Sequence, residues 1–97
     1  MSAALSAVSV PPRAVAVRFL LSADAEPGLL PRLLQPFAKR DLIPERIQAR
    51  REGDVLHVDI LLLDPEPGYA DLIAGNLGQV IGVHDVRQVR DHSARAA

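Results

Sequence analysis

The chain has no cysteine, no tryptophan, one tyrosine and two phenylalanines among its 97 residues. Without cysteine, disulfides, thiol catalysis and cysteine-ligated zinc are excluded. So few aromatic side chains leave little for stacking on nucleic-acid bases. The formal net charge of -1 lacks the basic excess that nucleic-acid or membrane-surface binders need. These absences favour a cytoplasmic protein and predict neither a nucleic acid nor a membrane as its partner.

The length and composition are those of one globular domain, with 48% hydrophobic and 24% charged residues. The main apolar run, residues 14–23, is interrupted by Arg18 and is too short to cross a bilayer. Residues 1–10 are small and apolar but lack the basic start and the apolar core of a signal peptide. We therefore expect a loose N-terminal tail over 1–13, one domain over 14–90 and a frayed tail over 91–97.

Along residues 14–34 the apolar residues first recur at every second position and then, after one short turn, at the spacing of a helix. This change predicts a strand that leads into a helix. The alternating core positions of the strand are Val15, Val17, Phe19 and Leu21. The helix is expected to begin at Pro27 or Gly28, after acidic residues that suit a helix N-terminus. Its apolar stripe comprises Leu29, Leu30, Leu33, Leu34, Phe37 and Ala38. Pro36 predicts a kink near Arg32 or an early tightening, without loss of the helix.

The second half of the domain predicts a hairpin, a helix and a last strand. Strands over 45–52 and 55–63 flank a Gly53-Asp54 turn, and the second strand alternates so that Leu56, Val58, Ile60 and Leu62 face the core. A helix over 69–80 is expected to bury Tyr69, Leu72, Ile73, Leu77 and Val80. Its Gly75 and Gly78 weaken the helix and are expected to allow a close approach to a neighbour. Gly82 leads into a strand over 83–89.

The order β-α-β-β-α-β predicts an α+β, ferredoxin-like fold. Right-handed crossovers place both helices on one face of an antiparallel sheet with strand order 4-1-3-2. On the other face a large apolar patch is expected, composed of Ala14, Ala16, Leu20, Leu61 and Leu63. Such a patch is best covered by a second copy, so we expect a homodimer, with a tetramer left open.

No catalytic motif is present, and the sequence predicts neither an enzyme, a metal site nor a cofactor. Arg18, His57 and Asp59 are expected to be neighbours on the open face, as an ordinary surface ion pair or, less favoured, as a polar cluster that binds a small zwitterion or fixes a subunit contact. His84 and Asp85 are adjacent in a strand and should point to opposite faces, which argues against a metal site. A glycine at a helix N-terminus, Gly28, offers N–H groups to a carboxylate, although a plain helix start explains it equally well.

The segment Glu26-Pro27-Gly28-Leu29-Leu30-x-Arg32-Leu33-Leu34-x-x-Phe37-Ala38-x-Arg40 resembles the strand-to-helix signature of ACT domains. The likeness is closest to the small regulatory subunit of acetolactate (acetohydroxyacid) synthase. The segment 76–86 is similar to the stretch that precedes the last strand of that family. The resemblance implies a non-catalytic domain that pairs with a second copy and regulates an enzyme of branched-chain amino-acid biosynthesis, with a large catalytic subunit as its partner.

In that family an amino acid binds at the dimer interface near the first loop, held by a glycine and two asparagines. Gly28 matches the glycine, whereas Ala25 and Ile43 stand at the asparagine positions. The resemblance therefore implies a ligand site composed of Asp24, Ala25, Glu26, Pro27, Gly28, Leu29 and Ile43. The loss of both amides weakens the expected grip on a buried charged ligand.

Two other functions fit the predicted fold. One is an assembly module that keeps the paired sheet and binds no ligand. The other is an acylphosphatase-like hydrolase, which needs an arginine in a phosphate-binding loop after the first strand. This chain has the acidic sequence Asp24-Ala25-Glu26 there, so the hydrolase is less favoured.

Overall fold

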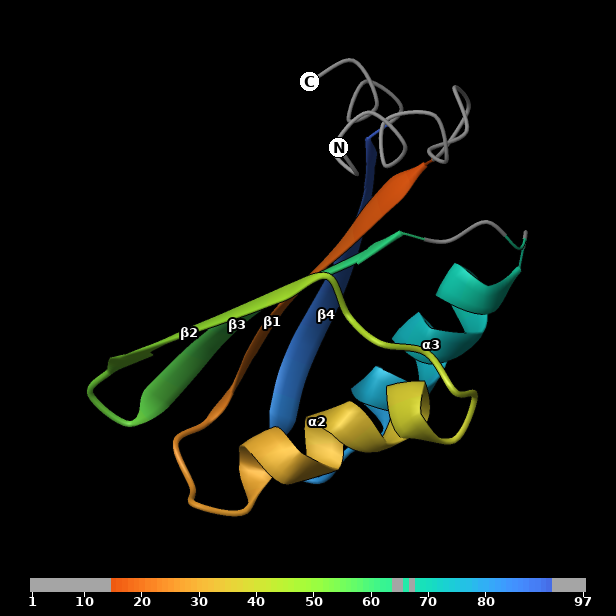
Figure 1. Cartoon of the computed structure of the whole chain (residues 1–97). Helices are drawn as coiled ribbons and strands as arrows, with labels where there is room; N and C mark the ends of the chain where they lie inside the picture. The colour runs from red at the N-terminus through yellow and green to blue at the C-terminus, as the bar shows by residue number, and fades with distance from the viewer. Residues whose placement is uncertain (1–14, 64–65, 67, 92–97) are drawn as a thin grey trace, which may run out of the picture.

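The structure, a computed structural model, describes residues 15–63, 66 and 68–91. The chain forms β1 (Ala16–Asp24), α2 (Leu29–Ala38), β2 (Arg46–Glu52), β3 (Val55–Leu63), α3 (Tyr69–Gly78) and β4 (Val83–Asp91). Figure 1 shows both helices on the same face of the sheet. The tails expected over 1–13 and 91–97 lie outside the described residues, except that β4 continues to Asp91 rather than ending at Val89.

The four strands form one antiparallel sheet in the order β2-β3-β1-β4, which confirms the predicted ferredoxin-like topology. β1 lies in the interior of the sheet, between β3 and β4. Alternation along β1 and β3 explains why this order forms, since both interior strands place every second apolar residue under the helices. The sheet edges are β2 and β4.

The core lies between β1, β3 and the two helices. Phe19 and Phe37 are buried in it and meet edge to face, with ring centroids 5.9 Å apart and planes at 77°. The other buried hydrophobic members of this cluster are Val17, Leu21, Ala23, Leu29, Leu33, Val58, Ile60, Leu62, Ala70, Ile73 and Leu77. The predicted core faces of both strands are therefore confirmed.

Helix α2 begins at Leu29, later than expected, because Gly28 is its N-cap rather than its first residue. Its apolar stripe is narrower than predicted: Leu29, Leu33 and Phe37 are buried, whereas Leu30 and Leu34 are 37% and 39% exposed. The helix continues through Pro36, as predicted. After its last residue, the N–H of Arg40 donates to the carbonyl of Phe37, three residues earlier, at 3.1 Å. The helix therefore ends in a tighter, 3₁₀-like turn.

Helix α3 ends at Gly78 and buries Ala70, Ile73 and Leu77. The expected burial of Tyr69 and Leu72 was wrong, because both lie on the helix side turned away from the sheet, 36% and 54% exposed. The expected role of the α3 glycines was wrong too. A Cβ at Gly75 would meet nothing within 4 Å, and one at Gly78 would make only an ordinary contact with Val86.

The β2–β3 hairpin extends sideways from the part of the sheet that the helices cover (Figure 1). Every residue of β2 is exposed. Its Gly53-Asp54 turn has φ of 61° at Gly53 and joins the paired residues Glu52 and Val55, as the sequence predicted. β2 is thus an edge strand without a helix over it.

The face of the sheet opposite the helices, named the open face below, is more polar than expected. Ala14 lies outside the described residues, and Ala16 is only 3% exposed. Leu20 and Leu61 are half-buried, and only Leu63 is exposed, at 43%. Arg18 and Asp59 form an ion pair in the middle of this face. The predicted large apolar patch is therefore wrong, because charged side chains separate its members.

Candidate functional site

Three turns meet at the end of β1 that leads into α2. The N–H of Asp24 donates to the carbonyl of Gly82 at 2.8 Å, in the turn between α3 and β4. The N–H of Ala25 donates to the carbonyl of Asp54 at 3.0 Å, in the tip of the β2–β3 hairpin. The β1–α2 turn is therefore held from both sides by elements that lie far away in the sequence.

The backbone donors of this turn are largely engaged. Glu26 N–H donates to Asp24 O at 2.9 Å, and Leu29 N–H donates to Glu26 O at 3.1 Å. Pro27 has no N–H. A ligand carboxylate therefore meets fewer free backbone donors than the sequence suggested, and the side chains around the turn become more important.

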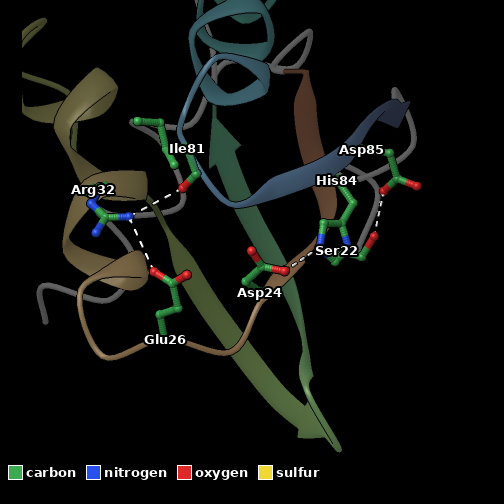
Figure 2. A network of polar contacts seen from close by, with 7 residues as sticks. All are labelled: Ser22, Asp24, Glu26, Arg32, Ile81, His84 and Asp85. Atoms are coloured by element: carbon green, nitrogen blue, oxygen red, sulfur yellow. Dashed lines mark hydrogen bonds and ion pairs between the residues drawn. The ribbon is translucent and has the colours of Figure 1, made fainter.

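Arg32 supplies a cationic group to the turn. Figure 2 shows its guanidinium between the Glu26 carboxylate and the backbone at Ile81. Arg32 Nη1 lies 3.9 Å from Glu26 Oε1 and donates to Ile81 O at 3.3 Å. A Cβ added to Gly28 would lie 3.1 Å from Arg32 Nη2, so the missing side chain of Gly28 makes room for the guanidinium. The side chain of Arg32 is 43% exposed and remains accessible to a ligand.

Polar contacts continue from the turn onto β4 (Figure 2). His84 Nε2 lies 2.7 Å from Asp24 Oδ1, and the Ser22 hydroxyl donates to Asp85 Oδ1 at 2.8 Å. The expectation that His84 and Asp85 point to opposite faces was wrong. The register of β1 and β4 shifts between Ser22 and Ala23, and this irregularity lets both side chains reach the same face of β1.

Gly82 is required where the α3–β4 turn approaches β1. Its φ is 101°, a conformation that glycine adopts without strain. A Cβ there would lie 3.5 Å from Leu29 Cδ1 and 3.8 Å from Asp24 Oδ2. The predicted turn at Gly82 is thus confirmed, and it carries part of the site.

The structure brings together all of the candidate residues from Asp24 to Leu29, but not Ile43. Leu42 N–H donates to Phe37 O at 2.9 Å, which places Ile43 near the C-terminal end of α2. The ten-residue helix spans about 15 Å. Ile43 is 86% exposed, so within one chain it lies far from Gly28 and points into solvent.

Sequence reasoning missed Arg32, Gly82 and His84 as members of the site. Arg32 follows Gly28 by four residues, and this spacing places the two on one side of the helix start. That signal was available. The contact between His84 and Asp24 depends on the irregular register of β4, which the sequence pattern does not show.

The polar cluster expected from Arg18, His57 and Asp59 forms two separate contacts in the structure. Arg18 pairs with Asp59, as expected, whereas His57 Nε2 lies 3.1 Å from Glu52 Oε1. A hollow of about 860 Å³ lies on this face and includes Ser22, Arg50, His57, Asp59 and Asp85 in its lining. Among the described residues no histidine and carboxylate group is arranged to hold a metal ion. No helix in the described part of the chain could span a membrane.

The fold is that of a ferredoxin-like domain with charged side chains gathered at its β1–α2 turn. The chain belongs to the ACT-like domain family, whose model matches residues 11–95. None of the curated protein sequences matches the chain.

Solved structures share the fold. The ACT domain from GTP pyrophosphokinase of Chlorobium tepidum superposes with a TM-score of 0.68 at 12% identity, over 78% of this chain and 99% of that one. A homoserine dehydrogenase from Thiobacillus denitrificans gives 0.66 at 14% identity, over 84% of this chain and 19% of the dehydrogenase. The regulatory subunit of aspartate kinase from Thermus thermophilus gives 0.60 at 14% identity, over 84% and 52%. This chain therefore corresponds to one part of the last two proteins.

Proposed function

We propose that this ACT-like domain is a regulatory module that binds a small amino acid between two copies of the chain. It would thereby control an enzyme of amino-acid biosynthesis, such as acetolactate synthase. In this proposal the domain itself carries no catalysis. The site comprises the turn from Asp24 to Leu29, with Ile43 contributed by the second copy.

The arrangement of charge at the β1–α2 turn carries the proposal. An amino acid presents a carboxylate and an ammonium group a few ångströms apart. Arg32 offers a guanidinium that lies against Gly28, where the helix N-terminus also favours an anion. Asp24 and Glu26 offer carboxylates on the same turn (Figure 2). Both charged groups of the ligand thus find an opposite charge without the asparagines that the family uses.

The exposed edge of β2 supports pairing with a second copy. Edge strands present unpaired backbone groups that a second strand can complete. When two β2 strands pair antiparallel about a two-fold axis at Ala49, Arg46 lies opposite Glu52 of the second copy. Moving the axis to Gln48 or Arg50 instead places arginine opposite arginine, so charge favours the axis at Ala49.

This register also explains how Ile43 joins the site. It places the segment that precedes β2 in the second copy alongside the hairpin tip at Gly53 and Asp54. The tip is bonded to the β1–α2 turn through Ala25 N–H and Asp54 O. Ile43 of the second copy would therefore reach the turn and offer an apolar contact to the ligand's side chain.

Four observations support the regulatory role. The chain belongs to the ACT-like family, and its sequence resembles the acetolactate synthase small subunit. One structural neighbour is named as a regulatory subunit of aspartate kinase, and another is a homoserine dehydrogenase. The partner enzyme is tested by co-expression with a large synthase subunit and recovery of the two chains as one complex.

Isothermal titration calorimetry of the full chain with each of the twenty amino acids tests the ligand. We expect one or a few small amino acids to bind, and Arg32→Ala to weaken binding by about tenfold or more, because a charged hydrogen bond contributes about 1.5–3 kcal/mol. Lys39→Ala removes a cation just beyond the other end of α2 and should leave the affinity unchanged. No heat with any amino acid, from a chain that still forms dimers, would instead identify a ligand-free assembly module.

A cysteine scan of β2 tests the pairing, since the native chain contains no cysteine. In the proposed register Ala49 faces its own copy as a hydrogen-bonded pair, with Cα atoms about 5.5 Å apart, which suits a disulfide. Ala49→Cys should therefore form a covalent dimer on mild oxidation. Ile47→Cys should not, because its counterpart is Arg51. Faster crosslinking at position 47 than at 49 would refute this register.

A further inference from the structure

We infer that the open face of the sheet is a second self-association surface, on which another copy packs face to face and antiparallel. This contact is separate from the β2 edge. If both form, the protein is a tetramer. The inference stands on the charge pattern of the open face, which includes Asp24 of the proposed amino-acid site, and it does not need a bound amino acid.

Cross-strand pairing arranges the open face in four levels, each identified by its β1 residue: Arg18, Leu20, Ser22 or Asp24. Directly paired residues share a face, so the register fixes which side chains lie side by side. The Arg18 level holds Arg46, Leu61, Arg18 and Val89, and the Leu20 level holds Gln48, Asp59, Leu20 and Arg87. The Ser22 level holds Arg50, His57, Ser22 and Asp85, and the Asp24 level holds Glu52, Val55 and Asp24, with His84 in contact with Asp24.

The open face is electrically uneven along the strands. The Arg18 and Leu20 levels together carry three arginines and one carboxylate. The Ser22 and Asp24 levels carry three carboxylates and one arginine, together with His57 and His84. One half of the face is therefore cationic and the other anionic, so two copies attract when they face each other in opposite directions.

A two-fold axis that runs across the strands between the Leu20 and Ser22 levels makes the two faces complementary. Each strand then lies over the same strand of the second copy and runs in the opposite direction. The Arg18 level of one copy therefore faces the Asp24 level of the other, and the Leu20 level faces the Ser22 level. Three arginine–carboxylate pairs meet, which are Arg46 with Glu52, Arg18 with Asp24, and Arg87 with Asp85, and Asp59 forms a fourth pair with His57. None of the four pairs joins like charges. Leu61 meets Val55, which adds an apolar contact.

Two of these arginines have no partner among the described residues. Within the described residues, the side chains of Arg46 and Arg87 have no hydrogen bond or ion pair. In the face-to-face contact Arg87 would gain the carboxylate of Asp85, and Arg46 would meet Glu52, the residue that it also faces at the β2 edge. The hollow of about 860 Å³ over the Leu20 and Ser22 levels gives the long side chains of the second copy room to enter. The arginines that have no described partner and the hollow that could admit side chains of a second copy thus lie on the same surface.

The size and symmetry of the face fit a tetramer. From strand and residue spacings the face measures about 20 Å by 27 Å, so it is a small interface and its association should depend on concentration. The axis across the strands also meets the proposed β2-edge axis at the level of Ala49, at a right angle. Both contacts can therefore form in one closed assembly with two-fold axes only.

Sedimentation of charge-reversed variants over a range of protein concentrations tests this surface. Arg87→Asp and Asp85→Arg each place like charges opposite one another in the contact, and neither residue lies on the β2 edge. Each variant alone should have half the assembled mass of the wild-type protein. An equimolar mixture of the two should return to the wild-type mass, because every unlike pair is restored between the two variants.

Two controls keep the result interpretable. Lys39→Asp makes the same charge change as Arg87→Asp on the helix layer and should sediment like the wild type. Recovery in the mixture cannot arise from misfolding of either variant. Variants that keep the wild-type mass, or a mixture that stays at the mass of its components, would overturn the inference. Amino-acid titration of the Arg87→Asp variant, which leaves Arg32 and the polar contacts of the β1–α2 turn unchanged, tests the proposed function separately.

Discussion

The two halves of the sheet differ in what covers them. In β1, Val17 and Phe19 are completely buried beneath the helices, whereas every residue of β2 is exposed. β2 nevertheless pairs along its whole length with β3. Hydrophobic burial therefore stabilises β1, while β2 depends on backbone pairing and on its hairpin turn.

Residues in the covered half determine the fold, whereas residues in the exposed hairpin can contact a partner without disturbing the core. A side chain in the covered half cannot change without a cavity or a clash. In the hairpin, charges such as Arg46 and Glu52 cost little to the fold and can select a binding register. Paired substitutions test this division, and the first pair takes one residue from each half.

The largest expected effect is that of Phe19→Ala. This substitution leaves a cavity beside Phe37 and should lower the free energy of unfolding by about 3–5 kcal/mol. Ile47→Ala, on the exposed hairpin strand, should lower it by about 1 kcal/mol or less. Urea denaturation followed by circular dichroism measures both. Similar losses for the two variants would mean that the hairpin is packed as tightly as the core.

A medium effect is expected at the α3–β4 turn, where Gly82 has φ of 101°. Gly82→Ala should destabilise the protein by about 1–2 kcal/mol, because a Cβ is strained in left-handed backbone. Gly75→Ala is the matched control. A Cβ there meets nothing within 4 Å, so the variant should be more stable by about 0.5–1 kcal/mol. Thermal unfolding of both variants should therefore shift the midpoint in opposite directions.

The smallest effect is expected on the open face. A double-mutant cycle of Arg18→Ala and Asp59→Ala should give a coupling energy of about 1 kcal/mol or less, since the Arg18 side chain is 43% exposed. The cycle is measured by chemical denaturation at low protein concentration. A much larger coupling would show that this face is shielded from water, as a face-to-face assembly would make it.

The fold could be predicted because its signals are local. Alternation in residues 15–21 and 56–62 fixes the core faces, and Gly53-Asp54 and Gly82 mark turns. The exposed members of the helices were misjudged because periodicity cannot say how wide a stripe the sheet covers. Leu30, Leu34 and Leu72 are apolar but lie at the margin of the contact.

The site was only partly predictable for a related reason. The turn from Asp24 to Leu29 is visible in the sequence as a change of period. Arg32 joins it across one helix turn, a local spacing that the sequence shows, whereas His84 joins it only through an irregular strand pairing. The polar residues Arg18 and Asp59 were expected on the open face, but the prediction of one large apolar patch did not allow for their position between its members, which the strand register determines.

The hydrogen bond from Ala25 N–H to the Asp54 carbonyl makes one amide a natural reporter of hairpin motion. That proton can exchange with solvent deuterium only when the hairpin tip separates from the β1–α2 turn. Its protection factor therefore measures how often the two turns part. Anything that holds the tip in place should slow the exchange at Ala25, and a single resonance would follow an event at the far edge of the sheet.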